Sequence, residues 1–172
     1  MDHIPVSTVS RTLLDYSGER LIVPELRGKD VVSVIHELSR ALHREGRIPD
    51  LLPFYQAALN GEYLAATVTA LGWALPHARV FSLNQPCFAV GRCPAPIIWA
   101  AQARHPVQLI FLFAVPETDT RGYLGILAAL ARLSRNLRLS ERLAHARGAA
   151  EILDVLRQAN VSAAAELSVA SQ

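Results

Sequence analysis

Apolar residues recur with a helical period in the first third of the chain. In residues 30–45 they are spaced three, four and seven positions apart, which places them on one face of an amphipathic helix. Gly46 follows directly and favours a helix stop. A second helix is predicted over residues 49–59, because its first residue is a proline, and we expect Asn60 and Gly61 to end it.

The pattern changes in the middle of the chain, where β-branched and aromatic residues gather in short runs. Residues 66–70 form one such run, Gly72 interrupts it, and residues 73–75 resume it. Residues 87–90 and 107–115 are predicted as buried strands. The second of these is apolar on both faces, which is typical of a strand inside a sheet that helices cover on both sides.

Helical spacing returns in the last third, over residues 123–134, 139–146 and 149–159. This order of elements predicts an α/β fold with a single mixed β-sheet sandwiched by helices on both faces. The length of 172 residues suits one domain, which we assign to residues 1–160. Residues 161–172 are mostly small or polar, and we expect a disordered tail there.

Composition and charge narrow the class of protein. Hydrophobic residues make up 51% of the chain, which excludes intrinsic disorder. The longest apolar runs reach about half of the ~18–20 residues that a membrane helix needs, so membrane insertion is not expected. The net charge is only +2 and the arginines are scattered, which argues against nucleic-acid binding. The first residues lack the pattern of a signal peptide, and we expect a cytoplasmic protein.

Histidine and cysteine residues are the first candidates for chemistry. His36 and His43 share a predicted helix but lie ~10 Å apart along its axis, too far for an easy shared metal site. Cys87 and Cys93 form no metal or redox motif. The sequence therefore predicts neither a metal centre nor a bound cofactor.

His77 has a more suggestive setting, because it follows Pro76, where a short predicted strand stops. Sheets of α/β proteins present their sites at strand ends. A neutral imidazole nitrogen can attack phosphorus without a base that first removes a proton. Arg79, Thr67 and Thr69 are candidates to hold the oxygens of a phosphoryl group there. On this pattern alone, an ordinary structural turn is the alternative interpretation.

Residues 62–79 read Glu-Tyr-Leu-Ala-Ala-Thr-Val-Thr-Ala-Leu-Gly-Trp-Ala-Leu-Pro-His-Ala-Arg. This segment resembles the active-site segment of the fructose/mannitol-type enzyme IIA domains of the bacterial phosphotransferase system. That family includes the nitrogen-regulatory enzyme IIA proteins. The resemblance covers about residues 11–158 and continues through residues 106–116, 123–133 and 150–156.

The resemblance implies a mixed, mostly parallel sheet with helices on both faces, and it implies an activity. The family's histidine takes a phosphoryl group from the phosphohistidine of a small carrier protein, HPr or its nitrogen-branch relative. Sugar-branch members pass the group to a IIB cysteine, while regulatory members use their phosphorylation state to bind or release other proteins. His77 matches the phospho-acceptor, Thr67 the hydroxyl residue beside it and Arg79 the basic residue that follows.

Three positions depart from the family pattern. Gly61 stands where the family usually has arginine, and Val68 replaces the first glycine of the turn. Tyr123 occupies the position of a second active-site histidine. A tyrosine donates one hydrogen bond but carries no positive charge, so two cationic partners of a phosphoryl group are lost.

Two functions therefore stay open. In the first, the chain is a phosphoryl carrier in which His77 is the nucleophile and Thr67, Arg79 and Tyr123 bind phosphate. Its partners would be an HPr-type carrier and either a IIB domain or a regulatory target protein. In the second, it is a degenerate IIA-fold protein-binding module with little or no phosphotransfer. The chain has no room for a IIB or IIC segment, so we expect a stand-alone, nitrogen-type regulatory protein.

The carrier hypothesis makes two structural predictions. His77 should lie at the surface, at the rim of a shallow cleft, and Tyr123 should lie within several ångströms of it. Trp73 and Trp99 are expected to be packing residues. The arginines of the last helices form either a basic stripe or an ordinary solvated helix face; they are Arg132, Arg135, Arg138 and Arg142.

Overall fold

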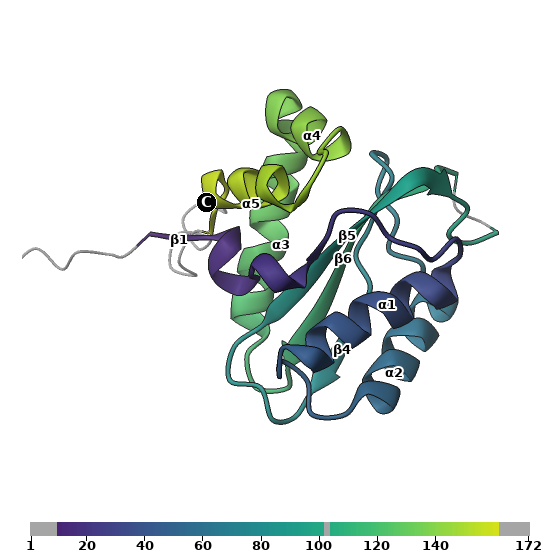
Figure 1. The fold of residues 1–172 in the computed structure, drawn as a ribbon. Helices are drawn as coiled ribbons and strands as arrows, with labels where there is room; N and C mark the ends of the chain where they lie inside the picture. Colours follow the sequence, from purple (N-terminus) through teal and green to yellow (C-terminus); the bar gives the residue numbers. More distant parts are fainter. Residues whose placement is uncertain (1–9, 102–103, 162–172) are drawn as a thin grey trace, which may run out of the picture.

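The computed structural model describes residues 10–101 and 104–161 and has a five-stranded β-sheet at its centre (Figure 1). The strands are β2 (Ile22–Val23), β3 (Trp73–Ala74), β4 (His77–Val80), β5 (Cys87–Ile97) and β6 (Val107–Pro116). Across the sheet, β2 is followed by β5 and β6, and then by β3 and β4, which both pair with the outer side of β6.

The directions of the strands confirm the predicted sheet. Strand β2 is parallel to β5, and β3 and β4 are parallel to β6. Only β5 and β6 pair in antiparallel fashion. The fold is thus α/β with a mixed, mostly parallel sheet. Strand β5 runs beyond the predicted residues 87–90, because its second half still pairs with β6, up to the contact between Ile97 and Val107.

Both ends of the described chain meet in a small second sheet, in which β1 (Arg11–Thr12) pairs with β7 (Asn160–Val161). Two short 3-10 helices, η1 (Leu13–Tyr16) and η2 (Glu19–Leu21), lead from β1 to β2. The expected tail after residue 161 lies outside the described residues.

Helices α1 (Val31–Arg44) and α2 (Leu51–Leu64) cover one face of the sheet (Figure 1). Helix α1 confirms the prediction for residues 30–45, and the Asp30 carboxylate caps it by accepting from the Ser33 N–H at 2.8 Å. The predicted end of α2 at Asn60 and Gly61 is wrong, because the helix continues to Leu64. Its last turn packs beside β4, and this tertiary contact outweighs the weak helix propensity of the two residues.

Helices α3 (Thr120–Arg135), α4 (Leu137–Ala144) and α5 (Ala149–Gln158) lie on the other face (Figure 1). All three confirm predicted helices, with boundaries that move by a few residues. Helix α3 starts earlier than predicted because the Asp119 carboxylate caps it, accepting from the Gly122 N–H at 2.9 Å.

Strand β6 contributes to two hydrophobic cores, because its side chains alternate between the faces of the sheet. Leu109, Phe111 and Phe113 pack with the residues of α3, α4 and α5. Ile110 and Leu112 pack with those of α1 and α2. All five side chains are buried, which confirms the prediction of a strand that is apolar on both faces.

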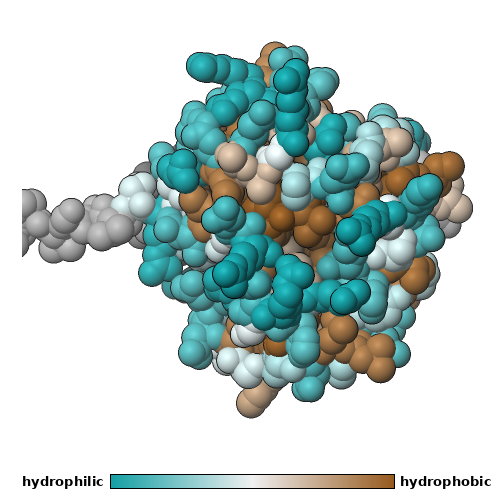
Figure 2. All heavy atoms as spheres, viewed as in Figure 1, coloured by the Kyte–Doolittle hydropathy of each residue, from teal (hydrophilic) through white to brown (hydrophobic). Residues whose placement is uncertain are grey.

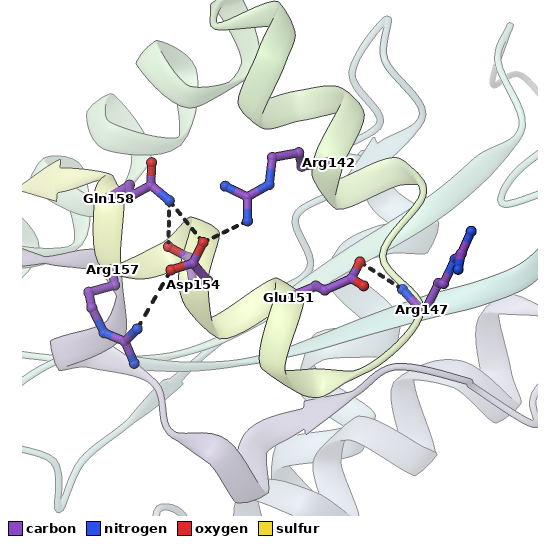
Figure 3. A network of polar contacts seen from close by, with 6 residues as sticks. All are labelled: Arg142, Arg147, Glu151, Asp154, Arg157 and Gln158. Carbon is purple, nitrogen blue, oxygen red and sulfur yellow. Dashed lines mark hydrogen bonds and ion pairs between the residues drawn. The ribbon is translucent and has the colours of Figure 1, made fainter.

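The outer face of α4 and α5 carries a polar network whose charged groups pair with one another (Figure 3). The Asp154 carboxylate accepts from Arg142 at 2.6 Å and from Gln158 at 3.0 Å, and it pairs with Arg157 at 3.7 Å. Arg142 of the predicted basic stripe is therefore neutralised within the chain. Arg132 and Arg135 also donate to backbone carbonyl groups, so the interpretation as a structural, solvated helix face is favoured.

No helix in residues 10–101 and 104–161 is both long and apolar enough to cross a membrane.

Candidate functional site

A tight hairpin leads from the end of α2 into the edge of the sheet. The Thr69 N–H donates to the Trp73 carbonyl at 2.8 Å, and the Gly72 N–H donates to the Thr69 carbonyl at 3.0 Å. Gly72 has a φ of +74°, and a β-carbon there would lie 2.5 Å from the carbonyl oxygen of Pro106, so only glycine fits. The run at residues 66–70 is thus one arm of this hairpin and not a strand of the central sheet.

His77 opens strand β4 and lies beside Phe113 of β6. Strands β3 and β4 follow β6 in one register, and the Pro76 carbonyl between them accepts from the Phe113 N–H at 2.9 Å. His77 therefore lies at the break within an edge strand and not beyond the strand's end. Its side chain is exposed while that of Ala78 is buried, which confirms the predicted surface position. The predicted cleft stays a prediction.

Tyr123, in the first turn of α3, stands next to His77. The centroids of the two rings are 5.7 Å apart, as the resemblance led us to expect. The Tyr123 ring also packs against Phe113, with centroids 5.4 Å apart. The pKa of the Tyr123 hydroxyl is raised to about 12, chiefly by burial and also by the charge of Glu62, while the charge of Arg79 acts in the opposite direction. At neutral pH the hydroxyl is therefore a neutral hydrogen-bond donor beside the imidazole.

Arg79 is exposed and projects to the same side of β4 as His77, because the two residues are two positions apart in a strand. Its guanidinium donates to the Pro116 carbonyl at 3.4 Å, a long contact that leaves further N–H groups available. The imidazole of His77 has no hydrogen-bond partner within the described part of the chain. An exposed imidazole, a guanidinium and a neutral hydroxyl donor thus share one edge of the sheet.

Behind this edge lies a buried carboxylate that the sequence analysis did not single out. Glu62 is 4% exposed and accepts three hydrogen bonds. Two come from Thr67, from the N–H at 3.1 Å and from the hydroxyl at 2.7 Å, and the third comes from the Trp99 indole N–H at 2.7 Å. Glu62 thereby joins the end of α2, the hairpin and the segment after β5. Glu62 is the one charged residue within α2. A single charged residue in an otherwise apolar helix indicates a carboxylate that is buried and hydrogen-bonded, and this pattern could have identified Glu62 from the sequence.

Thr67 faces inward in this arrangement. Its hydroxyl proton is donated to Glu62, and its oxygen accepts from the Leu75 N–H at 3.0 Å. A hydroxyl has a single proton, so direct donation to phosphate requires Thr67 to release Glu62. The role of Thr67 as a phosphate ligand stays a prediction. Its contacts hold the hairpin in front of His77. Trp99 is buried, as expected of a packing residue, and it adds the hydrogen bond to Glu62.

The three departures from the family pattern lie close to this hairpin and to His77. A β-carbon at Gly61 would lie 3.9 Å from the His77 carbonyl oxygen, so the position that usually carries arginine adjoins the site. Val68 pairs with Ala74 across the hairpin and has no positive φ. The left-handed residue of this turn is Gly72 instead, which explains why valine is tolerated at position 68.

The other histidines of the described residues lie away from His77. His105 lies two residues before β6, whereas His77 pairs with Phe113, eight residues after His105 and so ~26 Å away along the strand direction. Within the described residues, no group of three or more His, Cys, Asp or Glu side chains is placed to hold a metal ion.

The fold is that of a small α/β domain with a histidine exposed at one sheet edge, and the comparison with known families identifies the class of protein. The family model described as "Phosphoenolpyruvate-dependent sugar phosphotransferase system, EIIA 2" matches residues 16–159. The chain belongs to this family, which confirms the resemblance inferred from its sequence.

Individual relatives include both regulatory and sugar-specific proteins. A nitrogen regulatory protein from Bradyrhizobium diazoefficiens is 28% identical over 145 residues, which cover 84% of this chain and 94% of the relative. The fructose-specific EIIABC component of Bacillus subtilis is 27% identical over 133 residues, but the chain spans only 21% of its length. The crystal structure of nitrogen regulatory protein IIA-Ntr from Neisseria meningitidis superposes with a TM-score of 0.72 at 26% identity, covering 83% of this chain and 97% of that one.

Proposed function

We propose that this chain is a regulatory phosphocarrier of the nitrogen type, which accepts a phosphoryl group on His77 from an HPr-type carrier. The observation that carries the proposal is the exposed His77 imidazole, which is unpartnered within the described residues and stands beside Tyr123 and Arg79. The nitrogen regulatory relative supports the regulatory assignment, because the match spans 94% of that protein.

In the proposed reaction, the unprotonated ring nitrogen of His77 attacks the phosphorus of the donor's phosphohistidine. The bond from phosphorus to the donor nitrogen breaks as the bond to His77 forms, and the donor imidazole leaves with the electron pair. The Arg79 guanidinium and the neutral Tyr123 hydroxyl donate to the phosphoryl oxygens as they pass between the two rings. Glu62 and Thr67 act behind them by holding the hairpin in position.

The number of positively charged side chains near His77 determines how fast we expect phosphoryl transfer to be. Gly61 supplies no guanidinium, and Tyr123 supplies a neutral donor where the family has histidine. Each charge-assisted hydrogen bond contributes ~1.5–3 kcal/mol, so their loss slows the transfer. We expect slow transfer to His77, followed by release to a IIB domain or by a change in binding to a regulatory target.

A protein-binding module without phosphotransfer is the second candidate. It is favoured by the same missing charges and by the commitment of the Thr67 hydroxyl to Glu62. The two functions differ in a single observable, which is whether the chain gains a phosphoryl group.

The test is incubation with phosphoenolpyruvate, enzyme I and HPr-type carriers, followed by intact mass measurement at neutral or alkaline pH. The carrier function predicts one acid-labile gain of about 80 Da that His77→Ala abolishes. His77 is exposed, so this variant should unfold at the same temperature as the wild type. If neither the wild type nor Tyr123→His gains mass with any competent donor, the chain is a binding module on a IIA fold.

A further inference from the structure

A second polar site lies along the β2 edge of the sheet, opposite the edge that carries His77. A cavity of about 740 Å³ opens there between residues 22–28 and the outer face of α1. In Figure 2, long hydrophilic side chains surround a small hydrophobic area near the middle of the visible face, where Figure 1 shows the chain running toward α1. The volume falls within the range of about 300–1,000 Å³ that is typical of small-molecule sites.

One wall of this cavity is held in place by contacts that do not involve a ligand. The Glu37 carboxylate accepts from the backbone N–H groups of Arg27 at 3.0 Å and of Gly28 at 3.1 Å. The Leu26 N–H donates to the Arg92 carbonyl on β5 at 2.9 Å. A β-carbon at Gly28 would lie 2.8 Å from the Ser33 hydroxyl oxygen, so the wall packs closely on α1. The wall is therefore set before any ligand arrives, which lowers the entropic cost of binding.

Basic side chains from both segments line the cavity. His36, Arg40 and Arg44 follow one another at intervals of four on α1 and so form a stripe along one side of the helix. Arg27, from residues 22–28, lines the same cavity. The guanidinium groups of Arg27 and Arg40 have no hydrogen bond or ion pair within residues 10–101 and 104–161, and Arg44 has only an exposed contact of 3.6 Å with Glu45.

The carboxylates of Glu25 and Glu37 also line the cavity, and they restrict which ligands can bind there. Glu37 is occupied by the two backbone N–H groups. Glu25 is exposed and able to accept a hydrogen bond from a hydroxyl or amino group. Val23 and Pro24 add an apolar surface. A fitting ligand therefore carries more than one negative charge at one end and a polar organic part at the other.

We propose that this cavity binds a phosphorylated small molecule, whose phosphate oxygens are held by Arg27 and Arg40. A guanidinium group binds phosphate through two parallel N–H donors, and two such groups from the two segments suit a diphosphate. The site is separate from His77, because β5 and β6 lie between β2 and β4 and place the two edges ~14 Å apart. The proposal holds whether or not His77 accepts a phosphoryl group.

Isothermal titration calorimetry at constant ionic strength tests the proposal, with pyrophosphate and ADP as the two probes. We expect saturable binding of at least one probe at a single site, with a dissociation constant below about 1 mM. Arg27→Gln and Arg40→Gln should each weaken that binding at least fivefold. Arg138→Gln is the matched control, because it removes the same charge from an exposed position on α4, and it should leave the affinity unchanged.

Backbone amide NMR spectra identify the place of binding. The amide signals of Arg27 and Gly28 should shift during the titration in the wild type. The proposal is overturned if neither probe binds in a saturable way, if Arg138→Gln weakens binding as much as Arg40→Gln, or if the amide shifts gather at another surface. Since none of these readouts involves phosphotransfer, failure here leaves the proposed role of His77 unaffected.

Discussion

The α4–α5 face and the β4 edge are both polar, but they use their charged groups in opposite ways. On α4 and α5, Asp154 pairs with Arg142 and Arg157 and accepts from Gln158, so the network satisfies itself (Figure 3). On the β4 edge, the His77 imidazole has no partner among the described residues. The first arrangement satisfies its charged groups within the chain, and the second leaves an imidazole exposed, which is the group that we propose accepts phosphoryl.

The β4 edge itself has two layers, one of polar side chains that pair with one another and one of exposed side chains. Thr67 and Trp99 both donate to the Glu62 carboxylate behind the hairpin, and Glu62 is buried. His77 and Arg79 are exposed in front. The buried layer fixes the backbone, so that the exposed layer needs no internal hydrogen bonds to stay in position. Substitutions in the two layers should therefore affect different properties, stability in one and transfer in the other.

The largest effect is expected for Glu62→Leu, which removes the acceptor of three hydrogen bonds. The buried N–H of Trp99 and the partly buried N–H of Thr67 then lose their partner, at about 1–3 kcal/mol each. The free energy of unfolding, measured by urea denaturation, should fall by about 3–5 kcal/mol. Glu62→Gln is the control, because it keeps one carbonyl acceptor, and it should cost about 1 kcal/mol. A loss below 1 kcal/mol in Glu62→Leu would show that the buried layer does not hold the hairpin.

Gly72→Ala should have the next largest effect. The alanine would adopt a positive φ, and its β-carbon would meet the Pro106 carbonyl oxygen. The two penalties together amount to about 2–4 kcal/mol of unfolding free energy. Gly18→Ala is a suitable comparison, since a β-carbon there meets nothing within 4 Å and the backbone is extended. Equal stabilities of the two variants would contradict the geometry of the hairpin.

Tyr123→His sharpens the difference between the layers, because it changes a half-buried residue that packs beside His77 and makes no hydrogen bond to Glu62, Thr67 or Trp99. It restores a potentially cationic partner 5.7 Å from His77, measured between the ring centroids in the wild type. At ~1.4 kcal/mol per tenfold, one charged contact should raise the initial rate of phosphoryl gain by a factor of about ten to a hundred. Tyr123→Phe should be slower than the wild type. If both variants transfer at the wild-type rate, Tyr123 has no part in the reaction.

Tyr123 also makes the protein sensitive to alkaline pH. Its pKa is about 12 in the folded chain because of burial, while an unfolded chain has a tyrosine pKa near 10. The unfolded state therefore releases this proton first, and the contribution to stability is complete below pH 10 and is lost as pH rises toward 12. Between pH 10 and 12, the wild type should lose more stability in urea than Tyr123→Phe does. A parallel decline of the two proteins would contradict this assignment.

The smallest effect is expected on the helical face. Arg142→Gln breaks the short contact with Asp154, but both side chains are exposed, and exposed ion pairs contribute about 0.2–1 kcal/mol. The unfolding free energy should fall by less than 1 kcal/mol, and phosphoryl gain should not change. A strong effect of Arg142→Gln on phosphoryl gain would mean that this face, too, takes part in the function.

The elements that could be predicted from the sequence are those with a long, regular period. The α1 helix and the two-sided β6 strand follow directly from their apolar spacing. The continuation of α2 through Gly61 could not be predicted, because it depends on packing against β4. The helix propensity of the local residues carries no information about that tertiary contact. The hairpin around Gly72 was missed for a similar reason, since β-branched residues suit a hairpin arm as well as a strand.

The candidate site, too, has a part that the sequence predicts and a part that depends on tertiary structure. The strand end after Pro76 singles out His77 and Arg79, the family resemblance adds Tyr123, and the structure brings His77 and Tyr123 together. The inward turn of Thr67 toward Glu62 was not predictable, because a hydroxyl next to a nucleophile looks the same in sequence whether it faces phosphate or a buried carboxylate. Its bond to Glu62 depends on side-chain direction, which only the folded hairpin determines.

The exposed His77 imidazole at the β4 edge is the group that we propose accepts phosphoryl, and mapping the phosphorylated residue tests this most directly. The wild type, His77→Ala and His36→Ala would be incubated with phosphoenolpyruvate, enzyme I and an HPr-type carrier and then fragmented under alkaline conditions. His36 is the matched control, an exposed histidine on α1. We predict one phosphoryl group, located on His77 in the wild type and in His36→Ala and absent from His77→Ala. A phosphoryl group on another residue, or one that persists in His77→Ala, would contradict the account.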